Sequence, residues 1–477
     1  MTGLYLAGGF TIGGLLFFIR NRRYMFFLVL GFLLLQIGFT IYEYAHLNTS
    51  ELVFFTADAL AVLLLIVLSL ISVPAMYHSR VFLISNQDNI RHSGIYFGAM
   101  VLLITSISAA YLANHIAVTW IFVEITTLSA SALIYHRRNN RSLEGTWKYV
   151  FVCAISITLV FIGILFLSFS LPQAVANDLS FAALMKNAGR LNLFWLRLAF
   201  IFIFTGFTAK LGLVPMYTAG IDAKDKAPSP AGALFASALV NVGFVGIFRI
   251  YGVVAQTPLH SWVNSIILIT AFLSVFVATV YILKVKNLKR LFAYSGVEHM
   301  GIVMMGIAAG GVGYYGAVLH IVCHALVKSS FFFQMGQVYR IYKSKNVYDV
   351  GDYFKYNLPG AIVMMLAFFS ASAMPPSGLF ISEFMIFRSL FEANHLLILA
   401  GVILLLTLII WAFAKNIFKL VFSPAVGFND KNREIIKPVE SISQFVLLAL
   451  AVYLGLNPPD GFVRLIEEAI HHLPSLK

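Results

Sequence analysis

Long apolar segments of helical length recur along the whole chain, and this feature constrains the fold more than any other. A run of roughly 20 apolar residues can cross a bilayer as an α-helix, in which every backbone polar group is satisfied within the segment. Continuous runs also differ from the alternating pattern of a β-barrel. The sequence therefore predicts an all-α integral membrane protein with about 14 transmembrane helices. The expected spans lie near residues 3–19, 24–42, 52–76, 94–112, 114–134, 147–170, 193–222, 229–253, 260–284, 288–309, 311–340, 357–394, 396–422 and 441–457.

The composition and the placement of charge agree with a membrane protein. Hydrophobic residues make up 60% of the chain and charged residues 11%, against about 45–50% and about 25% in soluble domains. Basic residues gather in alternate loops such as "RNRR", "HRRNNR" and "KVKNLKR", with about 23 of the 33 Lys and Arg on one side and about 5 on the other. The positive-inside rule then predicts that both termini lie outside the cytoplasm. The net charge of +13 is explained by a lipid bilayer and does not indicate nucleic-acid binding.

Two spans carry strong helix-breaking signals. "FTGFTAKLGLVPMYTAG" contains Gly212 and Pro215, and "SASAMPPSGLFISEF" contains Pro376. Pro and Gly inside membrane-length runs interrupt a helix, and each break has an ionisable residue nearby, Lys210 or Glu383. The two segments are an odd number of spans apart, so they cross the membrane in opposite directions. This arrangement predicts two inverted repeats that each hold a broken helix. The alternative is that Pro and Gly are merely common in transmembrane helices.

A carboxylate and an amine lie inside the predicted membrane region. Glu124 is roughly mid-span in "FVEITTLSASALI", and Lys210 lies two spans later. Close together, each stabilises the charged form of the other, and when they separate, both tend to become neutral. Such a pair can take up and release protons as its spacing changes. The alternative is a static buried ion pair that fixes two helices in register.

The segment "LHIVCHALVKSSFFF" places His320, His324 and Lys328 four residues apart. On a helix they share one face, roughly 6 Å apart along the axis. Each ionisable group inside a bilayer costs about 2.5–3.5 kcal/mol, so three in register indicate a function. His titrates near neutral pH, a buried Lys can do so too, and one water could bridge each gap, which predicts a proton wire. A haem site is a rival reading, although two His on one helix cannot sandwich a haem, and a metal site lacks an evident third ligand.

Several other polar residues fall within or near the spans. Glu298 is expected near the cytoplasmic end of its span, as a proton inlet or in a surface role. Glu383 is expected to lead protons outward or to couple the second break to transport. Asn241 is mid-membrane and can hold a water but carries no charge. Asp58 and Arg249 lie near the outer ends of their spans, and these positions indicate structural roles.

The chain offers few ligands for a redox cofactor. Its two cysteines, Cys153 and Cys323, lie in apolar spans with neither a disulfide nor a metal-ligand spacing. No iron–sulfur or haem ligand set is evident, so the sequence predicts no cofactor or metal in this chain. If redox chemistry drives the protein, a partner subunit must supply it.

Six segments together resemble one family: "FVEITTLSASALI", "GFTAKLGLVPMYT", "KAPSPAGALFASALVNVGF", "KRLFAYSGVEHMGIV", "LHIVCHALVKSSFFF" and "PPSGLFISEF". They are similar to the antiporter-like, proton-conducting membrane subunits of respiratory complex I, Mrp cation/proton antiporters and group 4 membrane-bound nickel–iron hydrogenases, including formate hydrogenlyase. The likeness covers nearly the whole chain and implies location in a prokaryotic cytoplasmic (inner) membrane. It implies four regions: N-terminal transmembrane helices at 1–90, antiporter-like repeats at 91–255 and 256–424, and a C-terminal helix with an amphipathic tail at 425–477.

The resemblance also implies roles for individual residues. By position, it implies a charge pair Glu124–Lys210, a central axis His320–His324–Lys328, and the outlet residue Glu383. In that family, redox chemistry in neighbouring subunits is coupled to proton or sodium movement. The implied partners are therefore other membrane subunits and soluble redox subunits of the same complex.

Departures from the family pattern refine this expectation. Asn241 stands where complex I subunits commonly carry Lys, and "GVEHMG" looks like the hydrogenase-type pattern, so that branch is favoured. "YTAGIDAK" replaces the common "HTWLPDAH", with Tyr217 for the first His and Lys224 for the second. The inlet near Asp222 is therefore open to question, and a wire from Lys210 would need water or Asn241 as a relay.

The main hypothesis is an ion-translocating, most simply proton-translocating, membrane subunit of a multi-subunit redox-driven complex. One alternative is a cation/proton antiporter, or an ion-coupled carrier of a small anion such as bicarbonate, without redox chemistry. Another is a structural membrane anchor with a closed channel. The residue pattern leaves proton and sodium open, because backbone carbonyls at a broken helix can hold sodium.

Overall fold

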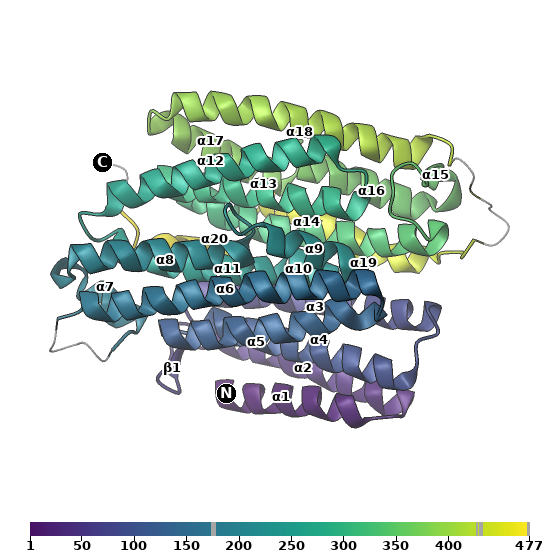
Figure 1. The fold of residues 1–477 in the computed structure, drawn as a ribbon, viewed down its shortest axis with the longest axis horizontal. Coiled ribbons are helices and arrows are strands. Elements are labelled where there is room, and N and C mark those ends of the chain that lie inside the picture. Colours follow the sequence, from purple (N-terminus) through teal and green to yellow (C-terminus); the bar gives the residue numbers. More distant parts are fainter. Residues whose placement is uncertain (173–177, 426–427, 429–432, 475–477) are drawn as a thin grey trace.

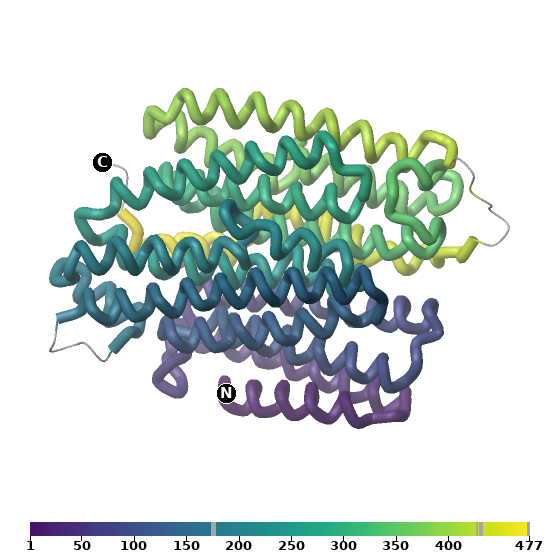
Figure 2. Tube along the Cα trace, in the orientation of Figure 1, coloured from purple at the N-terminus to yellow at the C-terminus, as the bar shows by residue number. Residues whose placement is uncertain are grey.

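The computed structural model describes residues 1–172, 178–425, 428 and 433–474. Of the predicted C-terminal region, residues 426–427, 429–432 and 475–477 lie outside the described part. The long helices run side by side along one direction (Figures 1 and 2). The helices are α1 (Thr2–Phe18), α2 (Arg22–Ala45), α3 (Ala59–Ser85), α4 (Ile90–Leu112), α5 (Ile116–Ile134), α6 (Asn140–Ser170), α7 (Phe181–Lys186), α8 (Leu193–Leu211), α9 (Thr218–Lys226), α10 (Ser229–Ala236), α11 (Ala238–Val254), α12 (His260–Lys284), α13 (Leu288–Ala309), α14 (Val312–Tyr342), α15 (Tyr353–Tyr356), α16 (Leu358–Ala371), α17 (Gly378–Glu392), α18 (Leu396–Phe422), α19 (Ile442–Leu456) and α20 (Asp460–Ile470).

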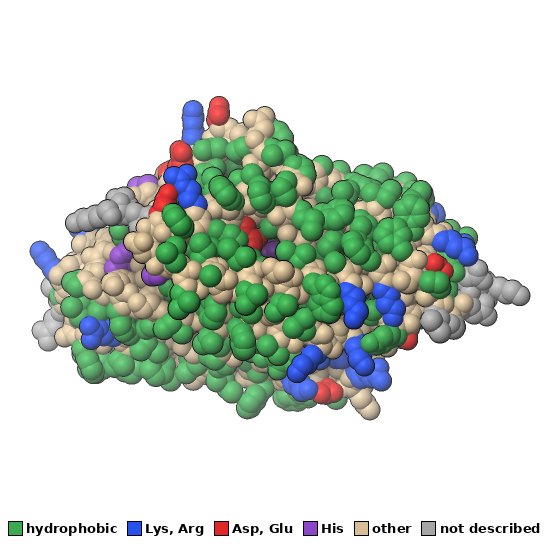
Figure 3. All heavy atoms as spheres, turned by 90° about the horizontal axis from the view of Figure 1, so that it is seen from above, with side chains coloured by type: hydrophobic (Ala, Val, Ile, Leu, Met, Phe, Trp, Pro, Cys, Tyr) green, Lys and Arg blue, Asp and Glu red, His purple; other side chains and the backbone are tan. Residues whose placement is uncertain are grey.

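The helical membrane architecture is confirmed. Within the described residues, 12 helices are long and apolar enough to cross a membrane, counting α10 and α11 as one. The 17-residue α1 and the interrupted pair α16–α17 supply the remaining predicted spans. Outer helices such as α18 and α2 bury only 22% and 33% of their most apolar stretch. Figure 3 shows that hydrophobic side chains cover most of one long face, as expected for a surface in contact with lipid.

Both predicted helix breaks are present. α8 ends at Leu211 because Gly212 adopts the left-handed conformation (φ 90°) and Pro215 cannot continue a helix; the chain becomes helical again in α9. The second break, at residues 372–377, contains two prolines between α16 and α17. There Ser377 caps α17 by accepting a hydrogen bond from Phe380 N at 3.2 Å.

Two span boundaries differ from the prediction. The third span was expected from residue 52, but Leu52 and Val53 form the tip of a small hairpin between β1 (Ser50–Glu51) and β2 (Phe55–Thr56), and α3 starts at Ala59. Hydropathy does not distinguish an apolar hairpin from the start of a span. The eighth span is interrupted at Ser237, between α10 and α11, where neither Pro nor Gly signals a break.

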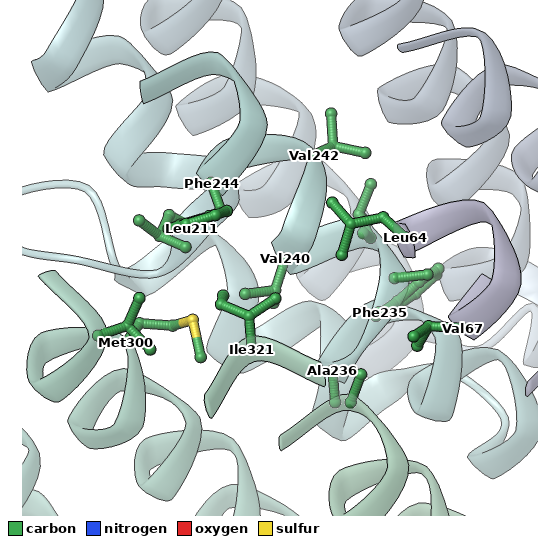
Figure 4. Close-up of a cluster of buried hydrophobic side chains, with 14 of the residues drawn as sticks. Leu64, Val67, Leu211, Phe235, Ala236, Val240, Val242, Phe244, Met300 and Ile321 are labelled. Atoms are coloured by element: carbon green, nitrogen blue, oxygen red, sulfur yellow. The ribbon is translucent and has the colours of Figure 1, made fainter. Parts of the chain in front are cut away.

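The centre of the bundle is formed by α10–α11, α13 and α14. These helices are buried along the whole of their most apolar stretch. Figure 4 shows buried apolar side chains packed around the α10–α11 junction, among them Leu211, Val240, Met300 and Ile321. Each of these four is the sequence neighbour of a buried polar residue described below. Buried polar groups are therefore embedded here among apolar side chains.

Candidate functional site

Lys210 lies in the last turn of α8 and contacts α5 and α6. Its Nζ donates hydrogen bonds to Thr127 Oγ1 at 2.8 Å and to the Tyr149 hydroxyl at 3.1 Å. Glu124 lies one turn before Thr127 on α5, where its Oε2 has no hydrogen-bond partner among the described residues. The structure thus brings the expected pair to neighbouring positions without an ion pair, and the ammonium bonds instead to Thr127, one turn further along the same face of α5.

Three histidines meet at the centre of the bundle. α13 and α14 are joined by Gly310 and Gly311, whose positive φ angles of 77° and 55° allow a tight turn. The two helices therefore run antiparallel, and His299 on α13 lies level with His320 and His324 on α14. His299 Nδ1 is 3.1 Å from His320 Nε2, and the rings of His299 and His324 are 5.2 Å apart between centroids. All three side chains are fully buried.

A chain of polar contacts continues from these histidines along α13. Lys328 Nζ donates to Ser295 Oγ at 2.7 Å, and Ser295 Oγ donates to Glu298 Oε2 at 3.5 Å. The same Oε2 lies 3.7 Å from His299 Nε2, which is longer than a hydrogen bond, and that nitrogen has no hydrogen-bond partner among the described residues. His320 extends the chain to α17, where its Nδ1 is 3.0 Å from Ser382 Oγ. We call Lys328, Ser295, Glu298, His299, His320 and Ser382 the central relay.

The one-helix wire through His320, His324 and Lys328 stays a prediction, and the structure adds contacts from α13 to it. His320 approaches His299 and Lys328 approaches Ser295, both on α13. Neither ring nitrogen of His324, nor Nε2 of His299, has a hydrogen-bond partner among the described residues. Glu298 was expected at the solvated end of its span, but it is only 3% exposed and lies well inside α13. Sequence spacing on α14 could not show that a second helix bridges the gaps between its polar residues.

Glu383 lies beside the central relay on α17, the helix that follows the second break. A cavity of about 20 Å³ is lined by Glu383, Glu298 and Ser295, and by apolar residues of α18. That volume accommodates about one water molecule, which needs polar partners of this kind. Figure 3 shows acidic and histidine side chains inside a small hollow in the hydrophobic face. The two carboxylates can therefore be linked through a single water.

Lys224, which stands at the second His of the common "HTWLPDAH" pattern, is a buried cation. It lies on α9 and is 4% exposed. A Cβ added at Gly296 would be 3.6 Å from Lys224 Nζ and 4.0 Å from His324 Nε2, so the missing side chain leaves space between these two groups. Lys289, expected in the basic loop "KVKNLKR", is also buried and donates to the Ala227 carbonyl at 2.8 Å.

The remaining predicted residues lie around this centre. Asn241 is fully buried on α11, and neither of its side-chain polar atoms has a hydrogen-bond partner among the described residues. Asp222 on α9 forms an ion pair with Arg290 at the start of α13. Arg249 and Asp58 also pair, at 2.6 Å, as expected for structural residues. Asp222 is thus engaged with a cation and does not face the central relay.

Sequence reasoning missed His299, Ser295, Ser382 and Lys224. The only signal for His299 was its position after Glu298 in "GVEHMG". Serines are common in transmembrane helices, so Ser295 and Ser382 carried no distinguishing pattern. In the described part of the chain, no group of three or more His, Cys, Asp or Glu has a geometry suited to holding a metal ion.

The comparisons with known proteins identify the family of the chain. The family described as "NADH:quinone oxidoreductase/Mrp antiporter, TM" matches residues 113–409, more than half of the chain. The chain belongs to this family. It is 27% identical over 414 residues to the Hydrogenase-4 component F homolog of Methylacidiphilum infernorum (isolate V4), a match that covers 84% of this chain and 86% of that relative.

Solved structures show the fold of this NADH:quinone oxidoreductase/Mrp antiporter family in the chain. One chain in the membrane-bound sulfane sulfur reductase, an archaeal respiratory membrane complex, has a TM-score of 0.86 at 18% identity, covering 99% of this chain and 98% of that one. One chain in the Mrp complex from Dietzia sp. DQ12-45-1b has a TM-score of 0.83 at 15% identity, covering 99% and 96%. Both are parts of multi-subunit membrane complexes. The family resemblance is confirmed, whereas the repeat limits 91–255 and 256–424 stay predictions.

Proposed function

We propose that this chain translocates protons as a membrane subunit of a multi-subunit, redox-driven complex of the hydrogenase or complex I type. The observation that carries the proposal is the central relay, a set of closely spaced titratable and hydroxyl groups from Lys328 to Ser382, whose one gap of 3.7 Å lies between Glu298 and His299. Buried ionisable groups in a membrane are costly, and they persist where they move ions. Family membership and the similarity to a Hydrogenase-4 component support the type of complex. The driving force comes from redox subunits and other membrane subunits of that complex.

Each step of the relay is a proton transfer between adjacent groups. Ser295 Oγ accepts a proton from Lys328 and passes its own proton to Glu298. Glu298 gives that proton to His299 Nε2, and the resulting imidazolium releases the Nδ1 proton to His320 Nε2. His320 then releases its Nδ1 proton toward Ser382. Each imidazole ends in its other tautomer, so its ring must rotate before the next cycle.

The charge distribution gives the direction. We propose that the basic end of the bundle faces the cytoplasm and that both termini lie on the outer side of a prokaryotic inner membrane. α14 then runs from the outer side at Val312 to the cytoplasm at Tyr342. Transfer from Lys328 to His320 carries a proton about 12 Å outward, through a hydrocarbon core of about 30 Å. Glu383 follows Ser382 on α17 and shares the water-sized cavity with Glu298 and Ser295, and in this proposal it leads the proton onward to the outlet.

Lys224 connects the first half of the protein to the central relay. Asn241 stands where a titratable group is expected, and it cannot carry a charge. α9 packs against α6, which carries Tyr149 beside Lys210, and also against α13, which carries His299. The broken helix therefore supplies, through Lys224, a cation in the region where the family pattern would use Lys at position 241.

The nature of the relay favours protons over sodium. Imidazoles and a lysine ammonium exchange protons but do not coordinate Na⁺, and a buried ammonium repels it. Sodium transport would instead use carbonyl oxygens at the two broken helices. Measuring Na⁺ uptake together with proton uptake separates the two ions.

The experiment is replacement of Lys328 by Met in the intact complex, with proton uptake per electron measured in sealed membrane vesicles. We expect proton uptake to fall at least tenfold while the complex assembles and still oxidises its electron donor. The matched control is Lys355→Met, an exposed lysine outside the relay. Undiminished proton uptake in the Lys328 variant would overturn the proposal and favour a structural anchor.

A further inference from the structure

The basic end of the bundle contains a large polar cavity that the proton relay does not use. Its volume is about 490 Å³, and it lies where α6 and the loop before it, the end of α9, the loop before α13 and the end of α14 meet. Six basic residues line it: Arg137, Arg141, Lys226, Lys286, Lys343 and Lys345. This volume falls in the range of about 300–1,000 Å³ that is typical of ligand sites. Figure 3 shows several Lys and Arg side chains gathered toward the right, at the same end as the cavity.

The cavity has more positive charge than its own carboxylates can neutralise. Asp225 is 1% exposed and already pairs with Lys345 at 3.0 Å and Lys226 at 3.1 Å. The second carboxylate in the lining, Asp349, accepts a hydrogen bond from Ser344 at 2.7 Å. Burial lowers the pKa of Lys345. The neighbouring Asp225 raises this pKa, but it offsets the lowering only in part, because nearby cations also lower the pKa. Arg141 and Lys286 form no ion pair with the described residues, so they are available to an anion.

The lining also indicates what kind of anion fits. It contains no Val, Leu, Ile, Met or Phe, and Tyr339 is its only aromatic residue. A phospholipid would need an apolar groove beside its headgroup for the acyl chains, and this cavity provides none. Carboxylates on alternate residues of an extended peptide are about 7 Å apart, so several can enter one cavity of this size.

We propose that this cavity binds an acidic segment of a cytoplasmic partner protein. From the proposed function the inference takes only the orientation that places the basic end in the cytoplasm. The cavity joins the ends of α9, the loop before α13 and α14, the three helices that carry Lys224, His299 and His320. A partner anchored there contacts the elements that hold the central relay, and its movement can alter their spacing.

The test uses the full chain in phosphatidylcholine nanodiscs and a labelled eight-residue peptide of alternating Glu and Ser. The double variant Arg141→Glu/Lys286→Glu should bind the peptide at least tenfold more weakly than the wild type. The control Arg23→Glu/Lys355→Glu changes the net charge equally at exposed residues that do not line the cavity, and it should retain affinity within twofold. Equal thermal unfolding of the two variants establishes that both are folded.

Two results would overturn the inference. If both double variants lose affinity equally, the peptide responds to net charge and not to the cavity. If phosphatidylglycerol in the nanodisc displaces the peptide from the wild type, the cavity is a lipid headgroup site. The Lys328→Met variant should bind the peptide like the wild type, because binding requires no proton transfer. Failure of the relay and failure of the cavity are therefore distinguishable.

Discussion

Replacing Ser295 by Ala tests the first link of the central relay. The Ser295 hydroxyl is the hydrogen-bond acceptor for the fully buried Lys328 ammonium, at 2.7 Å. A hydrogen bond to a charged group contributes about 1.5–3 kcal/mol. Without it, the charged lysine becomes less favourable by that amount, and each 1.36 kcal/mol changes a rate about tenfold. If protonated Lys328 is an obligatory intermediate, proton transfer should slow by about 10- to 150-fold.

The assay is the initial rate of proton uptake by sealed vesicles at saturating electron donor. Ser329→Ala is the matched control, since Ser329 is equally buried but its hydroxyl only donates to the Ala325 carbonyl of its own helix. That variant should pump at nearly the wild-type rate. The reasoning is refuted if Ser295→Ala and Ser329→Ala pump equally well.

Three further predictions concern other parts of the structure. Lys224→Met should slow proton uptake at least tenfold, whereas Lys355→Met, at an exposed lysine outside both the relay and the basic cavity, should not; equal rates in the two variants would remove Lys224 from the path. Gly243→Ala should lower the free energy of unfolding by about 1–3 kcal/mol, because the added Cβ would clash with the backbone nitrogen of Leu211, next to Lys210. The control Gly38→Ala has open space around it and should not lower it. Similar melting curves for the two variants would contradict the close packing at Gly243. Arg340 donates to Glu434 at 2.8 Å; burial alone would raise the pKa of this carboxyl, but Arg340 and Ser85 lower it below the usual 4.5. The pair should therefore stabilise the protein by about 1 kcal/mol above pH 4.5 and lose this contribution as the pH falls further. The difference in melting temperature between the wild type and Glu434→Gln should then vanish in acid. A difference that persists in acid would refute the lowered pKa of Glu434.

The transmembrane helices and their breaks could be predicted because the physics behind them is local. A bilayer requires long apolar helices, and Gly212, Pro215 and Pro376 interrupt them wherever they pack. The interruption at Ser237 has no such local cause and could not be predicted. The hairpin tip at Leu52 was misassigned because apolar character alone does not separate a turn from a span.

The residues of the site could be predicted only in part, because contacts between helices depend on rotation and register. His320 and Lys328 were found from their spacing on one helix, but the bridge through His299 depends on how α13 crosses α14. Lys210 contacts Thr127 and not Glu124, and these two residues share one face of α5 about one turn apart, so the sequence could not show which of them the ammonium reaches. Lys224 looked like a loop cation, and only its packing against α13 shows that it points inward.

The most direct test of the account replaces His299 by Leu and measures protons taken up per electron transferred in sealed vesicles. His78→Leu is the control, since His78 is also buried but hydrogen-bonds to Ser443, away from the relay. The account predicts that the His299 variant assembles, transfers electrons and takes up at least tenfold fewer protons, while the His78 variant keeps the wild-type ratio. A wild-type ratio in the His299 variant would contradict it.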